Sequence, residues 1–277
     1  MPLKPSRFLD PKTDIVFKKI FGNNPDLLKS FLNGVLPLPD DGLIEDLEYL
    51  TPEQTPRIPT MKNTIVDVKC RDQQGRIFIV EMQLHWTDSF KQRLLFGASK
   101  AYVQKLWKGE DYESLCPVYG LGIINMVFDH ETEEWFHHYR TINVKNSSQV
   151  LEGLELMFIE LPKFKPQTFL QRKMGVLWLR FLKELDERLT EIPEEFNQSP
   201  ELSKAMELAQ ESAYNLAELE AYDKYWDIIR VENSHKKGSF KEGLKEGEKQ
   251  ATFEIAKKML EAGIDKQIIA TVTGITF

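Results

Sequence analysis

Two acidic residues, Asp67 and Glu81, lie in neighbouring stretches of the chain that are rich in β-branched and aromatic residues. The first stretch is Asn63–Cys70 and the second is Arg76–Leu84, and the link between them ends in Gly75. Glycine at that place suits a turn with positive φ, so the two stretches are predicted to form a β-hairpin. The hairpin therefore has an acid on each strand.

The two acids can act together only if the strand register places them on the same face of the hairpin. If Arg71 pairs with Ile77, antiparallel counting places Asp67 opposite Glu81 on one face, and a shift of one residue would separate them. Facing carboxylates repel, and two carboxylates suit a hard divalent cation such as Mg²⁺ or Mn²⁺. The alternatives are an exposed hairpin face with scattered charges, or an ion pair of Lys69 with Asp67 or Glu81.

Composition limits the class of protein. The chain has 277 residues, of which 42% are hydrophobic, and a net charge of -7. It has no apolar run of transmembrane length, no apolar signal core near its start and only two cysteines, so a cytoplasmic protein without a membrane span is expected. The acidic balance argues against a nucleic-acid coat protein but leaves room for local contact with DNA.

The order of predicted elements mixes helices and strands up to about residue 165. Asp10, Pro11 and Gly22 frame a first helix that carries Asp14, which either complements the helix dipole or serves a site. Predicted elements follow at Pro25–Gly34, Leu43–Leu50, the hairpin, Asp88–Trp107, Val118–Phe128, Trp135–Val144 and Glu155–Leu161. Lysines and arginines make Asp88–Trp107 basic, as either a solvated face or a phosphate-contacting surface. The adjacent His137 and His138 point to opposite faces of a strand and are interpreted as structural.

The rest of the chain is predicted to be helical. Helices are expected at Phe169–Leu189 and Glu201–Ser234, followed by a flexible linker around Lys236–Gly247. The tail after Thr252 forms a small helical hairpin in which Asp265 caps the last helix. It could read DNA, pair two copies of the chain or pack on the long helix. The predicted division is a core at 1–165, a helical extension packed on it at 166–235, and a linker with tail at 236–277.

These motifs resemble the PD-(D/E)XK nuclease superfamily, and within it the Rpn group of recombination-promoting nucleases and transposases. The residues that carry the resemblance are Asp14–Phe21, Ile65–Val68 and Val80–Gln83, together with the helix that contains Arg93 and Tyr102. The resemblance implies a mixed-sheet α/β core like that of restriction endonucleases, with a helical C-terminal extension. It also implies a Mg²⁺-dependent DNA endonuclease, with Mn²⁺ as a substitute, and leaves a homodimer open.

The resemblance also assigns roles to residues. Asp67 and Glu81 match the acids that bind the metal, Asp14 matches an acid that some members bring to it, and Gln83 stands where the pattern usually has lysine. Because glutamine can orient a water but adds no charge, Lys69 is a candidate for the missing charge. Arg93 and Tyr102 are candidate supporting residues. The alternative function is a catalytically inactive module of the same fold that binds DNA or another protein.

Overall fold

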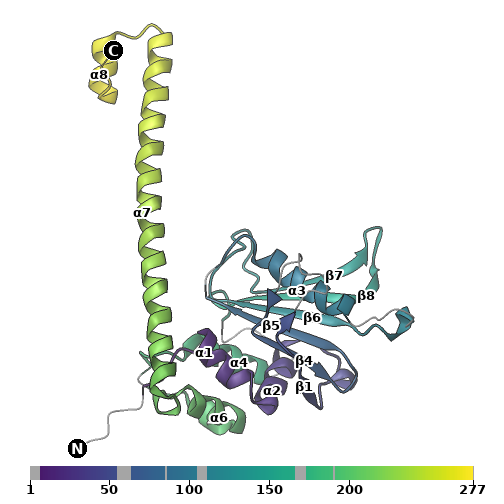
Figure 1. The fold of residues 1–277 in the computed structure, drawn as a ribbon. Coiled ribbons are helices and arrows are strands. Elements are labelled where there is room, and N and C mark those ends of the chain that lie inside the picture. Colours follow the sequence, from purple (N-terminus) through teal and green to yellow (C-terminus); the bar gives the residue numbers. More distant parts are fainter. Residues whose placement is uncertain are drawn as a thin grey trace, which may run out of the picture. The chain divides into compact units, whose positions relative to one another are not determined.

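The computed structural model describes residues 7–54, 64–84, 86–104, 111–165, 173–189 and 191–276 (Figure 1). The chain divides into two compact units, Met1–Glu218 and Leu219–Phe277. Among the described residues, none of the helices combines the length and the apolar character that a membrane crossing requires.

A six-stranded mixed sheet forms the centre of the first unit. Its strands in spatial order are β1 (Leu47–Tyr49), β4 (Val68–Asp72), β5 (Ile77–Gln83), β6 (Val118–Ile124), β8 (Asn146–Glu160) and β7 (Phe136–Asn143). The pairs β5–β6 and β6–β8 are parallel, and the other neighbours are antiparallel. A separate two-stranded ladder joins β2 (Glu53–Gln54) to β3 (Thr64–Ile65). The predicted mixed-sheet α/β fold is confirmed.

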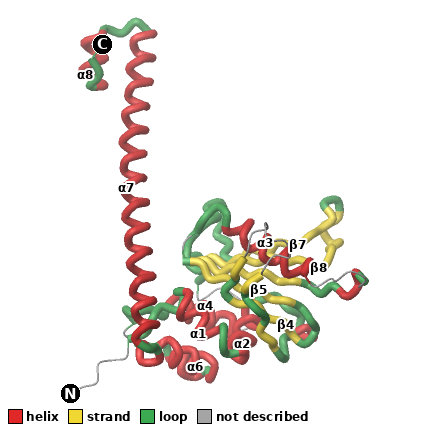
Figure 2. The backbone as a smooth tube through the Cα atoms, in the orientation of Figure 1, coloured by secondary structure: helices red, strands yellow, loops and turns green. Residues whose placement is uncertain are grey.

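Helices cover both faces of this sheet, as Figures 1 and 2 show. The helix α3 (Phe90–Gln104) lies on one side, and α1 (Asp14–Phe21), α2 (Pro25–Val35) and α4 (Lys173–Glu184) lie on the other. Two further helices, α5 (Glu194–Gln198) and α6 (Pro200–Ala209), complete the helical layer. Six of the seven residues of β5 are buried, which a strand covered on both faces requires.

Each face of the sheet has its own core. Ile77 and Ile79 pack with Phe90, Leu94 and Ala98 of α3 in one buried cluster. On the other side a cluster of aromatic rings joins the helices, with centroid distances of 4.9 to 6.0 Å, and its members are Phe17, Phe21, Phe31 and Trp178. The carboxyl end of β5, which carries Glu81 and Gln83, is thus held between two packed layers.

The predicted hairpin is right in register and wrong in extent. Arg71 pairs with Ile77 and Val68 with Val80, as the counting required, and Gly75 has φ +80°. The first strand of the pair, however, begins only at Val68, because Thr64 and Ile65 belong to the separate ladder with β2. The chain bends between the two ladders, and Asp67 lies at this bend.

Several element boundaries differ from the predictions because tertiary contacts decide them. The first helix begins at Asp14 with Thr13 as its N-cap, while Asp10 forms an ion pair with Lys12. The strand predicted at Leu43–Leu50 shortens to β1, and the last two strands form a long β7–β8 ribbon. The helix predicted at Glu201–Ser234 is two helices, since α6 ends at Ala209 and the next begins at Leu216.

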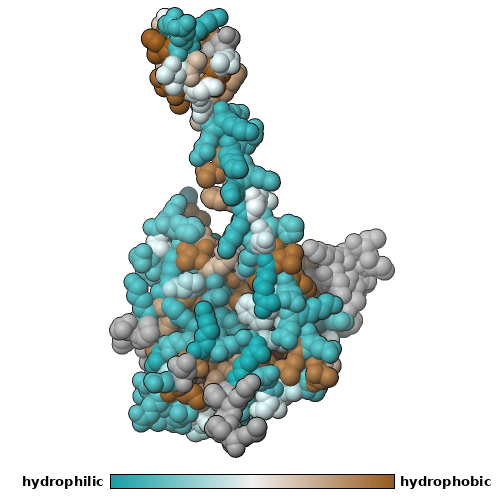
Figure 3. All heavy atoms as spheres, turned by 90° about the vertical axis from the view of Figure 1, so that its left-hand side faces the viewer, coloured by the Kyte–Doolittle hydropathy of each residue, from teal (hydrophilic) through white to brown (hydrophobic). Residues whose placement is uncertain are grey.

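The second unit consists of most of α7 (Leu216–Glu261) and of α8 (Lys266–Thr273). The predicted linker around Lys236–Gly247 is wrong in this structure, because α7 runs through it. Glu and Lys are strong helix formers, and Glu242 and Lys245 are spaced so that opposite charges adjoin on the helix surface. Hydrophilic side chains cover most of the visible middle of α7 in Figure 3.

The tail follows its prediction closely. After α7 the chain turns through Gly263, whose φ is +79°, and the carboxylate of Asp265 accepts a hydrogen bond of 2.8 Å from the amide of Gln267. Gly274, with φ +72°, ends α8. Ile268 and Val272 of α8 expose more than half of their surface, and apolar side chains are visible on the tail at the top of Figure 3.

Candidate active site

The bend before β4 brings Asp67 to the strand that carries Glu81. Continuing the β4–β5 register by one residue sets Asp67 beside Glu81. The amide of Met82 donates a hydrogen bond of 2.8 Å to Oδ2 of Asp67, so the carboxylate is fixed to the backbone next to Glu81. The charge of Asp67 also acts on Glu81. The structure therefore brings the two predicted acids together, although one of them lies outside the strand.

The first helix supplies a third carboxylate and a lysine. Asp14 is the first residue of α1, and Lys18 follows one turn later. The ammonium of Lys18 lies 2.7 Å from Oδ1 of Asp14 and 3.8 Å from Oδ1 of Asp67. Lys18 thus connects two acids of the site, a position that the sequence pattern did not indicate.

The helix α3 supplies an arginine on the opposite side of Glu81. The guanidinium of Arg93 donates a hydrogen bond to Oε1 of Gln83, and its Nη2 lies 3.6 Å from Oε2 of Glu81. Gln83 and Glu81 are two residues apart on β5 and therefore point to the same face. The cation next to Gln83 is Arg93, not the lysine that the family pattern places at position 83.

Glu81 and Asp67 both have a pKa above that of an ordinary carboxyl group. Burial raises the pKa of Glu81 to about 7, against the opposing effect of Arg93, and the charge of Asp67 adds to the rise. Burial also raises the pKa of Asp67 to about 6, with the Met82 amide opposing the shift and Asp14 adding to it. Both shifts come mainly from the removal of the carboxylates from water, and a cation bound between them would oppose both.

One atom of the site has no hydrogen-bond partner. Oε1 of Glu81 is buried and unpaired among the described residues. The side chain of Glu81 is only 7% exposed, whereas those of Asp14 and Arg93 are 56% and 43% exposed, so the site has a closed end and an open end. Carboxylate oxygens with an unfilled coordination position are the donors that Mg²⁺ and Mn²⁺ prefer. The residues present therefore fit a divalent metal ion.

The remaining predicted residues lie apart from this centre. Lys69 shares the face of Glu81 but lies across from Ile79 and close to Lys100, and burial lowers its pKa, with the charge of Lys100 adding to the effect. Tyr102 packs against the backbone of Gly153 on β8. Nine residues of helix, about 13 Å, separate it from Arg93.

A second group of acids with a histidine was not expected from the sequence. One donor atom each from Asp129, His137 and Glu160 lie within 4.8 Å of one another. Oε1 of Glu160, however, already lies 2.7 Å from Nε2 of His137 and 3.0 Å from the ammonium of Lys163. Its oxygens therefore have close partners inside the protein, whereas Glu81 has only Arg93 at 3.6 Å and one unpaired oxygen among the described residues. His138 bonds to Glu155 instead, so the two histidines have different partners.

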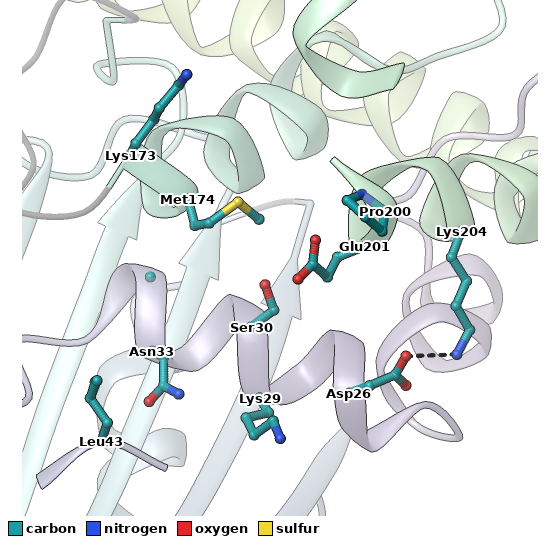
Figure 4. Close-up of a pocket in the computed structure, with 11 residues that line it drawn as sticks. Asp26, Lys29, Ser30, Asn33, Leu43, Lys173, Met174, Pro200, Glu201 and Lys204 are labelled. Carbon is teal, nitrogen blue, oxygen red and sulfur yellow. Dashed lines mark hydrogen bonds and ion pairs between the residues drawn. The ribbon is translucent and has the colours of Figure 1, made fainter. Parts of the chain in front are cut away.

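A groove of about 730 Å³ lies between α2, α4 and α6 (Figure 4). Its described lining includes neither Asp67 nor Glu81. Lys204 forms an ion pair of 2.8 Å with Asp26 there, drawn as a dashed line in Figure 4. The groove is therefore separate from the acids of the hairpin.

Comparison with known proteins agrees with this architecture. The model of a family described as PD-(D/E)XK nuclease family transposase matches residues 11–236, and one described as Rpn/YhgA-like nuclease family, C-terminal HTH domain, matches residues 249–276. No curated protein and no solved structure matched the chain.

A mixed sheet with two acids at the ends of neighbouring inner strands and helices on both faces has the architecture of a PD-(D/E)XK nuclease. The chain belongs to the PD-(D/E)XK nuclease family of transposases, and its tail is a helix-turn-helix domain of the Rpn/YhgA-like type. The family resemblance seen in the sequence is thus confirmed, and the tail domain indicates binding to DNA.

Proposed function

We propose that this protein is a metal-dependent DNA endonuclease that cuts phosphodiester bonds during recombination or transposition. The observation that supports this most directly is the buried Glu81 carboxylate, whose Oε1 has no partner in the described part of the chain, beside the half-buried carboxylate of Asp67. Two such acids are costly to hold ionised without a cation. The match of a nuclease family model to residues 11–236 also supports phosphodiester cleavage as the reaction.

Asp67 and Glu81 would hold the metal, and Asp14 would add a carboxylate at the open end. A bound Mg²⁺ or Mn²⁺ supplies a Lewis acid for a phosphate oxygen and lowers the pKa of a water. Arg93 donates a hydrogen bond to Oε1 of Gln83. The side-chain N–H groups of Gln83 can then donate to a water near Glu81. Arg93 also brings to this place the positive charge that glutamine lacks.

The test is nicking of supercoiled plasmid DNA by the full chain with Mg²⁺, with Mn²⁺ and with EDTA. Asp67→Asn and Glu81→Gln keep the shape of each side chain and should each reduce nicking by about 100-fold or more. Asp129→Asn is the matched control from the second acidic group and should nick at the parental rate. Nicking that persists in EDTA, or parental nicking by Glu81→Gln, would refute the proposal.

A second function stays open because Gln83 departs from the family pattern. A catalytically inactive relative would use the helix-turn-helix tail to bind DNA or would recruit another protein. It should bind duplex DNA without metal, show no turnover, and lose no affinity on Glu81→Gln. The plasmid assay and a binding titration on the same preparations separate the two functions.

A further inference from the structure

Aromatic side chains from three parts of the chain gather at the end of the sheet where β5 and β6 stop. Trp86 follows β5, Phe128 follows β6, and Tyr139 lies on β7. The rings of Trp86 and Phe128 stack with their centroids 4.5 Å apart and an angle of 18° between their planes. Trp86 and Phe128 are partly exposed, and Tyr139 is 45% exposed. These three residues form an open aromatic surface, which we call the aromatic platform.

A lysine of α3 joins the three rings of the platform. The ammonium of Lys91 lies 4.3 Å from the ring centroid of Phe128, 5.5 Å from that of Tyr139 and 5.8 Å from that of Trp86. It also donates a hydrogen bond of 3.3 Å to Oη of Tyr139. The attraction between a cation and the faces of aromatic rings stabilises this arrangement. A molecule that contacts the platform therefore meets flat apolar rings beside a positive charge.

The backbone of two platform residues is held in place by hydrogen bonds. The amide of Phe128 donates a hydrogen bond of 2.8 Å to Oε2 of Glu160, whose side chain is fully buried. The amide of Trp86 donates one of 3.2 Å to Sδ of Met126. A surface that is already ordered loses little conformational entropy when it binds a partner. Glu160 is thus a positioning residue for Phe128.

The platform adjoins the acids of the proposed active site. The guanidinium carbon of Arg93, which contacts Glu81, lies 5.1 Å from the ring centroid of Phe90. The ring of Phe90 in turn lies 6.1 Å from that of Trp86. Gln83 and Trp86 are three residues apart, which is at most about 10 Å along the chain. Because one strand of DNA advances about 3.4 Å per phosphate, the platform lies within about three nucleotides of Gln83.

We propose that the aromatic platform stacks an unpaired base of the DNA substrate, a few nucleotides from the phosphate that is cut at Asp67 and Glu81. This inference rests on the proposed endonuclease function and adds a class of substrate, DNA with a single-stranded segment next to the cleavage site. Aromatic rings bind the flat face of a base, and a paired base hides that face in the stack of the duplex. Lys91 supplies a positive charge for the phosphate of the same nucleotide.

The experiment measures the affinity of the full chain, in EDTA, for a fluorescent blunt duplex and for the same duplex with a short single-stranded overhang of either polarity. The helix-turn-helix tail meets the same duplex in both, so the ratio of the two affinities reports on the unpaired nucleotides. The parent should prefer the overhang. Trp86→Leu removes the flat ring and should lower this ratio by about fivefold or more, whereas Trp86→Phe keeps a ring and should retain most of it.

Tyr139→Leu and Tyr112→Leu form a matched pair of variants. Tyr139 belongs to the platform and is exposed, so Tyr139→Leu should lower the ratio with little loss of stability, and it carries the test if Trp86→Leu does not fold. Tyr112 is 80% exposed and lies before β6, at the other end of that strand, so Tyr112→Leu should keep the parental ratio. Thermal unfolding identifies the folded variants. A parental ratio in every folded variant of Trp86 and Tyr139 that lacks the ring would overturn the proposal.

Plasmid nicking with Mg²⁺, measured on the same proteins, separates this proposal from the function on which it rests. Nicking by a parent that binds the blunt and the overhang duplex equally removes the base-stacking site and leaves the nuclease. A preference for the overhang that Trp86→Leu loses, without nicking by the parent, leaves the base-stacking site and removes the nuclease. No binding of either DNA by the parent removes both.

Discussion

Nη2 of Arg93 lies 3.6 Å from Oε2 of Glu81, so the helix that covers the sheet brings a cation to the acidic strand. The same guanidinium donates to Oε1 of Gln83. One arginine therefore contacts both residues of the Glu-x-Gln segment. In the proposed function, the charge that a family lysine would supply from β5 would come from α3.

Replacing Arg93 should reduce cleavage more than binding. We expect Arg93→Gln to lower the single-turnover nicking rate by about 10- to 100-fold, because both the orientation of Gln83 and a nearby positive charge are lost. Arg188→Gln, which removes an exposed arginine paired with Asp186, should nick at the parental rate. Equal rates for the parent and Arg93→Gln would show that Arg93 has no part in the reaction.

The lysine that the family pattern has at position 83 can be introduced into the parent and into an Arg93→Ala variant. Gln83→Lys alone should not raise the nicking rate, because the new ammonium would lie beside the Arg93 guanidinium and the two charges repel. In an Arg93→Ala background the same change should raise the rate about tenfold over Arg93→Ala. The nicking rates of the parent, of Gln83→Lys, of Arg93→Ala and of the double variant give the coupling free energy between positions 83 and 93. If the two changes have additive effects, Arg93 does not take the place of the family lysine.

The sequence was sufficient to predict the strand register at the site but not the bend at Asp67. The register of β4 and β5 was predictable, since a short turn ending in Gly75 fixes which residues face each other. The bend at Asp67 was not, because alternation of side chains continues through Val66 and Val68 and does not reveal that β3 pairs with β2. Local periodicity carries no information on pairing with distant segments.

The contacts of Arg93 and Lys18 depend on tertiary packing. In the sequence Lys18 is only a basic residue on a helix, and Arg93 is a candidate supporting residue through the family resemblance, but no pattern indicates which acid either one contacts. Only the packing of α3 on β5, and of α1 near Asp67, turns them into partners of the acids. The helix through Gly238, Gly243 and Gly247 was missed for a different reason, since glycine spacing is typical of linkers and helices tolerate it only among strong helix formers.

The stability of the metal-free protein should fall as the pH rises from about 4.5 to 7. Glu81, with its pKa raised to about 7, and Asp67, with its pKa raised to about 6, bind more protons in the folded state than in the unfolded state over this range. Stability is therefore lost as they ionise, by roughly 2 to 3 kcal/mol for Glu81.

Urea unfolding in EDTA at several pH values measures this loss. Glu81→Gln should remove most of the dependence and be more stable than the parent at pH 8. Mg²⁺ at saturating concentration should raise the parental stability at pH 8 and leave Glu81→Gln nearly unchanged. The quantity to compare is the difference in the free energy of unfolding between the parent and Glu81→Gln. If this difference stays constant, or shifts in favour of the parent, between pH 4.5 and 7, the prediction is wrong.

Two glycine substitutions should have opposite effects because their surroundings differ. A Cβ on Gly34 of α2 would lie 2.8 Å from the backbone nitrogen and 3.0 Å from the Cα of Gly175 on α4. Backbone atoms cannot move aside singly, so Gly34→Ala must separate the two helices and should destabilise the first unit by about 1 to 3 kcal/mol. A Cβ on Gly243 meets no described atom within 4 Å, and Gly243→Ala should stabilise α7 by roughly 1 kcal/mol. Urea unfolding followed by near-UV circular dichroism measures the first effect, and the helical signal at elevated temperature measures the second. A tolerated Gly34→Ala would mean that α2 and α4 are not in backbone contact.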